Sequence, residues 1–176
     1  MSEPQTDSPS VREQLEAWHS ESFAWAVACC DHEPGDAEDV LQMTYLKILD
    51  GRARFEGRSA FKTWLFGVVR MTALEQRRRA WWGWLRTAPV EAVREHRSLD
   101  ESPDDALARR EKIDQIRAAC LRLPSRQREV LMLVFHHDVT LDEAAQIMRV
   151  SPGSARKHYQ RGKEQLRAWL GQLQSA

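Results

Sequence analysis

The side chains best suited to chemistry lie near the C-terminus, in the stretch SPGSARKHYQRGKEQLRAWL (151–170). Its apolar and small residues recur at helical spacing, which is typical of a buried helix face; they are Ala155, Tyr159, Gly162, Leu166 and Trp169. The opposite face carries Arg156, Lys157, Gln160, Arg161 and Lys163. Arginine and glutamine can read base edges, and lysine can hold phosphates. The pattern predicts a DNA-binding helix, with a merely solvated charged face as the alternative.

A second short helix precedes this one. Thr140 and Glu143 have capping-box spacing, and Ser151–Pro152 is an N-cap followed by proline at the first helical position. Two helices joined by a tight turn, the second with a basic exposed face, predict a helix-turn-helix whose second helix lies in the major groove. Asp138 stands where glycine would best end the helix before it, and aspartate tolerates the left-handed conformation better than most residues.

Other reactive residue types form no catalytic set. The three cysteines, Cys29, Cys30 and Cys120, lack framework spacing, so we expect structural thiols in a reducing cytoplasm. His136–His137–Asp138 is interpreted as a solvated turn, and we expect no metal site and no cofactor. A metal-dependent nuclease using the acids of 36–39 lacks a second carboxylate cluster. We therefore expect a protein that is not an enzyme.

Charge is neutral in total but divided into blocks. Lys plus Arg and Asp plus Glu both number 26, whereas residues 11–50 carry −7, 51–79 carry +6 and 150–176 carry +4. Separate acidic and basic blocks indicate separate surfaces for different partners. No run of about 18 apolar residues is present, and the polar start is no signal peptide, so we expect no membrane insertion.

The elements that must position these residues are helices. We expect one helix from Ser10 to about Cys30, ended by Pro34 and Gly35, and a second from near Asp36. A third, capped by Ser59, runs to the arginines 77–79, and further helices span about 104–122, 125–136, 140–149 and 152–171. The prediction is an all-α fold: a disordered N-terminus (1–10), a helical domain (11–86), a flexible linker (87–103) and a helix-turn-helix domain (104–176).

Two blocks of the chain resemble a known family. DAEDVLQMTYLKIL (36–49) with RFEGRSAFKTWLFGVVRMTAL (54–74) resembles region 2 of the extracytoplasmic-function (ECF) class of bacterial sigma factors. LPSRQREVLMLVFHHDVTLDEAAQIMRVSPGSARKHYQRGKEQLR (123–167) resembles region 4. Helix-turn-helices are common, but both blocks in this order with a linker between them are highly specific. The resemblance implies a promoter-recognition subunit of RNA polymerase.

The resemblance assigns the acidic block to polymerase. In such proteins the helix beginning DAEDVLQ grips a coiled coil of the core enzyme, which implies contacts from Asp36, Glu38, Asp39, Gln42 and Tyr45. Compensation of the helix dipole is an additional role for the three acids. Met43 stands where the family more often has glutamate, so one charged contact is expected to be absent.

The resemblance also assigns the first basic block to the minus-ten element. Melting needs aromatic surfaces for unstacked bases and cations for phosphates, and the implied residues are Arg58, Lys62, Trp64, Arg70, Met71 and Arg77. Phe61, Leu65 and Val68 are expected in the core. Trp64 matches a wedge aromatic, with a core role as the alternative, and Met71 replaces an asparagine of some relatives. Trp81, Trp82 and Trp84 lie outside the match and are expected to close the core, with DNA or regulator contact as alternatives.

The implied partners are core RNA polymerase, double-stranded and locally melted promoter DNA, and an anti-sigma factor that wedges between the two domains. Arg156, Gln160 and Arg161 match positions that read the minus-thirty-five element. Lys163 is expected to contact the DNA backbone, and Lys157 either the backbone or the base edges. A stand-alone helix-turn-helix activator is the alternative, but it leaves the region 2 block unexplained.

Overall fold

The computed structural model describes residues 10–86 and 118–173, except the side chains of 80–86 and 172–173. Within these two ranges all regular secondary structure is helical, as the sequence predicts. The expected N-terminal tail, the linker and most of the expected helix 104–122 lie outside the described residues; only 118–122 of that helix are seen, and they are helical. In the described part of the chain, no helix combines the length and apolar character needed to span a bilayer.

Two helices occupy the segment expected to form one. α1 (Val11–Ala17) begins with a capping box formed by Ser10 and Glu13, and α2 (His19–Cys29) follows. The helix breaks at Trp18, which has φ −97° and ψ 8°. Neither glycine nor proline marks this break in the sequence. The Trp18 ring instead lies under Lys62, whose Nζ is 4.9 Å from the ring centroid. The break in the helix therefore coincides with a tertiary contact.

The starts of the next two helices differ from expectation for local reasons. α3 (Pro34–Leu49) begins at Pro34 rather than near Asp36, because proline fits the first helical position, where no N–H bond is required. The left-handed residues Asp31 and His32 make the preceding turn. α4 (Phe61–Arg86) follows Ala60, whose carbonyl accepts from the Trp64 N–H. Ser59 is therefore not the cap; its hydroxyl donates to the Ala60 carbonyl.

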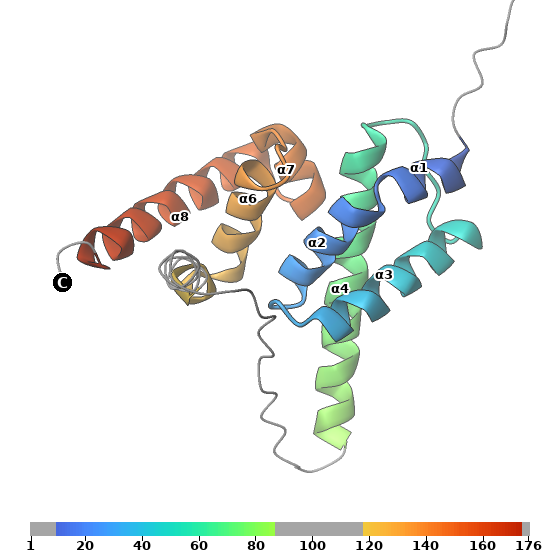
Figure 1. Ribbon diagram of the computed structural model, residues 1–176, viewed down its shortest axis with the longest axis horizontal. Helices are drawn as coiled ribbons and strands as arrows, with labels where there is room; N and C mark the ends of the chain where they lie inside the picture. The colour runs from blue at the N-terminus through green and yellow to red at the C-terminus, as the bar shows by residue number, and fades with distance from the viewer. Residues whose placement is uncertain (1–9, 87–117, 174–176) are drawn as a thin grey trace, which may run out of the picture.

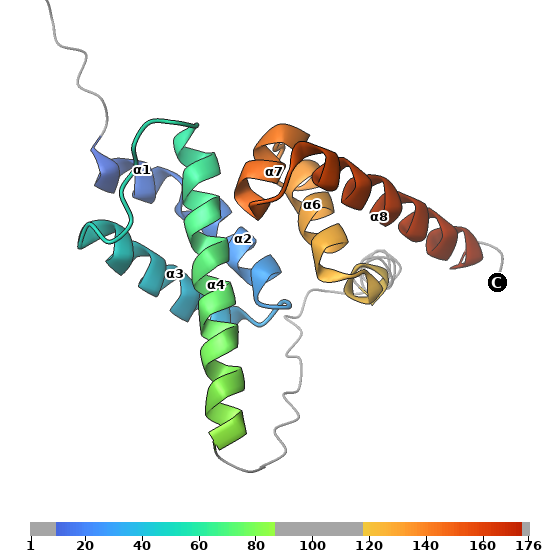
Figure 2. The ribbon, with the colours of Figure 1, turned by 180° about the vertical axis from the view of Figure 1, so that it is seen from behind.

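α4 is the axis of the N-terminal half. Leu65, Phe66 and Val69 are fully buried in it, and Phe61 is nearly so, whereas Val68 is half-buried. Trp25 of α2 is also fully buried, and its indole Nε1 donates to the Phe66 carbonyl at 3.0 Å. The C-terminal turns of α4 extend past the other helices (Figures 1 and 2). They include 81–84, so the tryptophans there are helical, while their side chains lie outside the described residues.

The C-terminal half consists of α6 (Ser125–Phe135), α7 (Leu141–Met148) and α8 (Pro152–Leu173). Asp138 adopts φ 51° after α6, which confirms the left-handed conformation expected there. α7 and α8 pack on each other and on α6, and α8 runs away from α4 (Figure 1).

The two halves are in direct contact. α4 packs against α7, and α2 packs against α6 (Figures 1 and 2). One hydrophobic cluster includes Trp25 and Phe66 from the first half and Val130 and Met148 from the second. The sequence predicts two separate domains, but it gives no indication that they share a core.

Candidate nucleic-acid and polymerase interfaces

The residues expected to bind polymerase all lie on α3, but on different sides of it. Glu38, Gln42 and Tyr45 line one groove, whose other lining residues are His19, Phe23 and Leu41. Asp36 lines a separate pocket beside α4, with Asp31 and Arg77 among its neighbours. Asp36, Glu38, Asp39 and Gln42 are exposed, and Tyr45 is half-buried. The structure thus brings three of the five side chains together.

The groove continues towards α1 as a largely apolar depression whose margin includes the ion pair of Arg12 and Glu16. Tyr45 and His19 also line the adjoining depression, with Leu15, Glu16 and Leu49. The Tyr45 hydroxyl lies 3.2 Å from His19 Nδ1, and burial raises the tyrosine pKa. Leu49 is 63% exposed and adds apolar surface to this depression. Such a surface fits a partner with an apolar face.

Trp64 belongs to an aromatic cluster at the start of α4. Its ring centroid lies 5.2 Å from that of Phe55 and 5.3 Å from that of Phe61, and the rings are tilted. Trp64 is half-buried, whereas Phe61 is buried. The cluster fixes one side of Trp64 and leaves the other accessible, so a packing role and a stacking role are compatible at this position.

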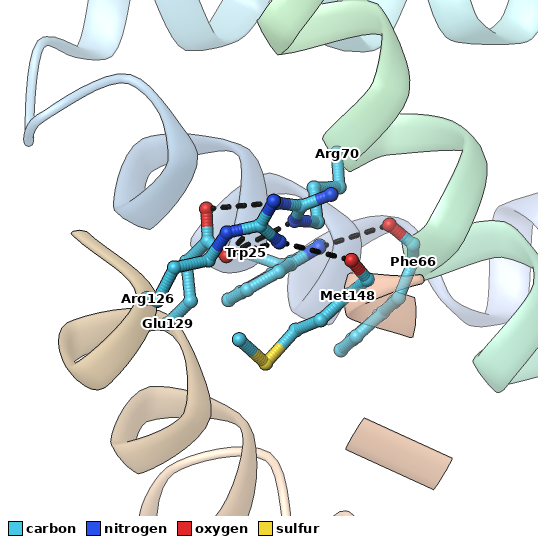
Figure 3. A network of polar contacts seen from close by, with 6 residues as sticks. All are labelled: Trp25, Phe66, Arg70, Arg126, Glu129 and Met148. Carbon is cyan, nitrogen blue, oxygen red and sulfur yellow. Dashed lines mark hydrogen bonds and ion pairs between the residues drawn. The ribbon is translucent and has the colours of Figure 1, made fainter. Parts of the chain in front are cut away.

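The expected cationic track, which runs from the loop before α4 along α4 itself, is only partly exposed. Arg58 is exposed and pairs with Glu56 at 2.8 Å, and Arg77 lies 3.7 Å from Asp31. Arg70 was expected on the surface, but this is wrong: its side chain is only 3% exposed because Glu129 of α6 covers it, with a closest N–O distance of 3.1 Å (Figure 3). Met71, next to it on α4, is half-buried.

Lys62 is also occupied. Its Nζ donates to the His137 carbonyl at 2.8 Å and lies 2.6 Å from a Glu21 carboxylate oxygen. The same ammonium lies over the ring of Trp18, as described above, and 5.6 Å from the Phe66 centroid. Lys62 is therefore half-buried between the two halves of the chain, not free on the surface.

The helix-turn-helix is formed by α7, the turn 149–151 and α8. Both expected caps are confirmed: Thr140 and Glu143 make a capping box, and the Ser154 N–H donates to the Ser151 hydroxyl. Hydrogen bonds from Thr140 hold the Glu143 pKa below its usual value. Arg149 ends α7 with φ 54°, a left-handed conformation that usually favours glycine.

The two faces of α8 match the expectation from spacing. Ala155 and Gly162 are buried, and Tyr159, Leu166 and Trp169 are half-buried. Arg156, Lys157, Gln160 and Arg161 are exposed. Lys163 differs from them because its Nζ lies 4.6 Å from the centroid of the Tyr159 ring and its side chain is half-buried. The exposed face therefore presents three cations and one amide before the helix reaches Lys163.

The two adjacent histidines have opposite environments, and the interpretation of both as solvated turn residues is wrong for one. His136 is exposed, but His137 is 2% exposed and lies edge-on against the stacked rings of Trp25 and Phe66. Burial, together with the nearby His136 and Lys62, lowers the His137 pKa to about 4. Among the described residues, no group of three or more His, Cys, Asp or Glu side chains could hold a metal ion.

The surroundings of the three cysteines make their thiols unreactive. Cys29 and Cys30 are buried and Cys120 is half-buried, and all three are free. Burial raises the pKa of Cys29 well above its usual value and that of Cys30 to about 11, so both are protonated at neutral pH.

Sequence reasoning missed the residues that cover the α4 cations. Glu129 and His137 contact Arg70 and Lys62 across more than 50 positions of chain. No helical periodicity, cap or motif reports such a contact, because it depends on how the two halves dock. The only available signal was the neutral total charge, which requires as many carboxylates as cations.

The comparisons with known proteins cover both halves. A family model for Sigma-70 region 2 matches residues 17–83, and one for Sigma-70 region 4 matches 113–166. The sigma factor CarQ of Myxococcus xanthus is 31% identical over 142 residues, which span 78% of this chain and 76% of CarQ. The ECF sigma factor SigX of Bacillus subtilis is 29% identical over 144 residues, 77% of this chain and 71% of SigX.

Solved structures show the same fold. The sigma factor RpoE, in complex with the anti-sigma factor NepR from Bartonella quintana, aligns with a TM-score of 0.71 at 23% identity over 91% of this chain and 96% of RpoE. CnrH, in complex with the cytosolic domain of CnrY, aligns with a TM-score of 0.62 at 21% identity over 90% of this chain and 86% of CnrH. With both regions in order and relatives matched across both halves, the chain belongs to the ECF class of RNA polymerase sigma factors.

Proposed function

We propose that the chain binds core RNA polymerase, carries it to promoters and helps to open the DNA, while the polymerase performs the catalysis. The observation that carries this proposal is the presence of both sigma regions in order on one chain. It acts in the cytoplasm, where polymerase and promoter DNA are found. Run-off transcription from a matching promoter with purified core polymerase tests it, and a chain that never stimulates transcription contradicts it.

The exposed side of α3 is the proposed polymerase contact. Glu38, Gln42 and Tyr45 share a groove, and Asp39 stands exposed on the same helix. Three acids near the start of α3 and an apolar floor are complementary to a basic helical partner. Asp36 belongs to this surface only at its edge, since it lies beside α4.

Charge reversal tests this contact. Asp39→Arg combined with Gln42→Ala should weaken binding to core polymerase by about tenfold or more, because it places repulsion where attraction is proposed. Glu164→Arg is the matched control, since Glu164 is an exposed acid on α8. Binding is measured by fluorescence anisotropy with labelled chain. Equal core affinity for the two reversed variants contradicts the assignment.

The loop 50–60 and α4 form the proposed minus-ten surface. Trp64 supplies a half-exposed ring for an unstacked base, and Arg58 supplies an exposed cation for the backbone. The same surface is proposed to include four further residues, Lys62, Arg70, Met71 and Arg77. The C-terminal half covers Lys62 and Arg70 in this arrangement.

The exposed face of α8 is the proposed reader of the minus-thirty-five element. Arg156, Gln160 and Arg161 are proposed to contact base edges, Lys163 the backbone and Lys157 either. Arg161→Ala should cost about 1–3 kcal/mol on the cognate element and reduce discrimination between bases. Lys163→Ala should weaken all sequences alike and reduce the salt slope by about 0.9.

Binding of both variants to cognate and scrambled duplexes across a salt series separates the two roles. The specificity ratio should fall for Arg161→Ala alone. If neither variant changes it, α8 does not read sequence in this way.

An anti-sigma factor is the proposed regulator. RpoE and CnrH, which share the fold, were solved with NepR and with the cytosolic domain of CnrY. We expect a protein encoded beside this chain to bind it and to compete with core polymerase. Co-expression and pull-down test this, and failure of every neighbouring product to bind contradicts it.

A further inference from the structure

We infer that Arg149, in the turn between α7 and α8, is a further DNA contact: its guanidinium binds a backbone phosphate beside the start of the DNA-reading helix. The backbone conformation of this residue, rather than helical spacing, points to the contact. The inference rests on the proposed binding of DNA by α8, and it adds to that surface a cation that lies outside α8 itself.

The turn requires a left-handed residue at position 149. Arg149 has φ 54° and ψ 50°, and its N–H donates to the carbonyls of Ala145 and Gln146. The Val150 N–H donates to the Ala145 carbonyl at 3.0 Å, which is the kind of bond that ends a helix through a left-handed residue. Any residue at 149 must therefore adopt this conformation, and glycine would adopt it without strain.

Arginine is an uncommon residue for such a position. Four non-glycine residues in the described ranges have positive φ, and three of them are Asp31, His32 and Asp138. Aspartate and histidine are enriched in the left-handed region, and a short polar side chain such as that of aspartate can form a local hydrogen bond there. Arg149 is the exception, because its long side chain brings the steric strain without that local bond.

Nothing in the described part of the chain offsets this strain. Arg149 is exposed, and no hydrogen bond or ion pair to another described residue holds its side chain. The negative end of the α7 dipole already has a cation, because Arg126 donates to the Met148 carbonyl at 3.0 Å (Figure 3). A second cation next to Met148 adds repulsion from Arg126 rather than a partner.

Arg149 extends the basic surface of α8 past the start of the helix. The turn leads directly into Pro152, the first residue of α8, and the first exposed cations of the helix are Arg156 and Lys157. The residues between Arg149 and Arg156 are uncharged, with the sequence VSPGSA. Two arginines therefore flank a helix start that has no charge and little bulk of its own.

This position suits a phosphate contact. A helix-turn-helix brings the N-terminal residues of its second helix to the base edges, so the turn just before them lies at the rim of the major groove. Phosphates line that rim, and arginine is a common donor to them. The small first turn of α8 allows a close approach to DNA and leaves Arg149 as the nearest cation on the N-terminal side. Because Arg149 has no ion pair within the described residues, no such pair has to break on binding.

Arg149 thus lowers folding stability and raises DNA affinity. Glycine at this position relieves the strain and removes the charge, so it should raise the melting temperature and weaken DNA binding in the same chain. A purely structural residue would change stability and binding in the same direction. The opposite signs are therefore the signature of the proposed contact.

Four variants of the full chain test it. Arg149→Gly removes both charge and strain, Arg149→Asn removes the charge with a residue that tolerates the conformation, and Arg149→Lys keeps both. Arg122→Gln is the matched control, because Arg122 is an exposed arginine before α6, outside the helix-turn-helix. Thermal melts followed by circular dichroism verify folding, and Arg149→Gly should melt above the parent.

The probe is a labelled duplex of about 20 alternating A·T base pairs, because the sequence-independent backbone charge is what Arg149 is inferred to bind. Fluorescence anisotropy measures binding across a salt series. Each phosphate contact contributes about 0.9 to the salt slope, so the loss of one should cost about 3.5-fold more affinity at about 50 mM salt than at about 200 mM. Arg149→Gly and Arg149→Asn should bind about fivefold to tenfold more weakly at the lower salt. Arg149→Lys and Arg122→Gln should keep the slope of the parent.

The outcomes separate Arg149 from the rest of the DNA-binding surface. Parent affinity and slope in Arg149→Gly and Arg149→Asn overturn the contact, and the proposed function stands if Lys163→Ala still reduces the slope. A reduced slope in Arg149→Lys also overturns it, since that variant keeps the charge. If Arg149→Gly weakens binding to core polymerase and not to the duplex, the partner is a protein and the phosphate contact is overturned. A parent chain that does not bind the duplex contradicts both the contact and the proposed binding of DNA by α8.

Discussion

Replacement of Gly162 by alanine tests the packing that positions the DNA-reading helix. A Cβ added there would lie 2.9 Å from Leu131 Cδ1 and 3.3 Å from both Leu131 Cγ and Gln127 Cβ. Leu131 is 4% exposed and Gln127 7%, so neither can move into solvent. Alanine gains about 1 kcal/mol of helix propensity, but overpacking costs about 1–3 kcal/mol. We expect a net loss of about 1 kcal/mol in the free energy of unfolding.

Gly67→Ala is the matched control, because Gly67 lies within α4 and its added Cβ would meet nothing within 4 Å. This variant should gain about 0.5–1 kcal/mol. The Gly162→Ala loss should shrink in combination with Leu131→Val, which removes the clashing carbon, and the coupling should reach about 1 kcal/mol. Urea unfolding followed by circular dichroism measures the parent and the four variants, including the Leu131→Val single variant. Equal stabilisation by both alanines would refute the close packing of α8 on α6.

Three further predictions concern the turn, the aromatic cluster and pH. Arg149→Gly should raise stability by about 0.5–1 kcal/mol in thermal melts, because its left-handed conformation is strained in arginine; an unchanged melting temperature contradicts this. Trp64→Ala should reduce permanganate-detected promoter opening more than Phe55→Leu, the control that loosens the same cluster, and an intact footprint assigns Trp64 to packing alone. Lowering the pH from about 8 to about 5.5 should weaken the packing of residues 118–173 on α2 and α4 about tenfold, since the His137 pKa is about 4 in this contact and should return to near 6.5 when exposed. The effect should begin near pH 6.5 and be absent in His137→Phe.

Features set by neighbouring residues could be predicted from the sequence. The caps Thr140–Glu143 and Ser151–Pro152 and the left-handed Asp138 depend on hydrogen bonds and backbone sterics within a few positions. The buried face of α8 follows from helical spacing alone. These elements carry the proposed minus-thirty-five contacts. The position of almost all of this surface could therefore be predicted from the sequence.

Features set by docking of distant segments could not be predicted. Arg70 lies within a helix that runs on into three arginines. Its local sequence pattern is the same whether solvent or Glu129 faces its side chain, and the sequence therefore predicts it on the surface. The break at Trp18 and the burial of His137 have the same origin, because both depend on contacts with α4. Pro34 differs: proline both ends and begins helices, and a single sequence did not decide between these roles.

The neutral total charge acquires a structural meaning in the contact between the two halves. Carboxylates of the chain itself, such as Glu129, Glu21 and Asp31, lie against the cations of α4, whereas most cations of α8 remain exposed. Because α8 runs away from α4 (Figure 2), its basic face can meet duplex DNA while the halves are still together. If α4 contacts DNA as proposed, phosphates must replace those carboxylates, and this exchange of one anion for another costs less than exposing unpaired buried charge. We therefore expect the minus-thirty-five contact to form first and the minus-ten contact only after the ion pairs on α4 have broken.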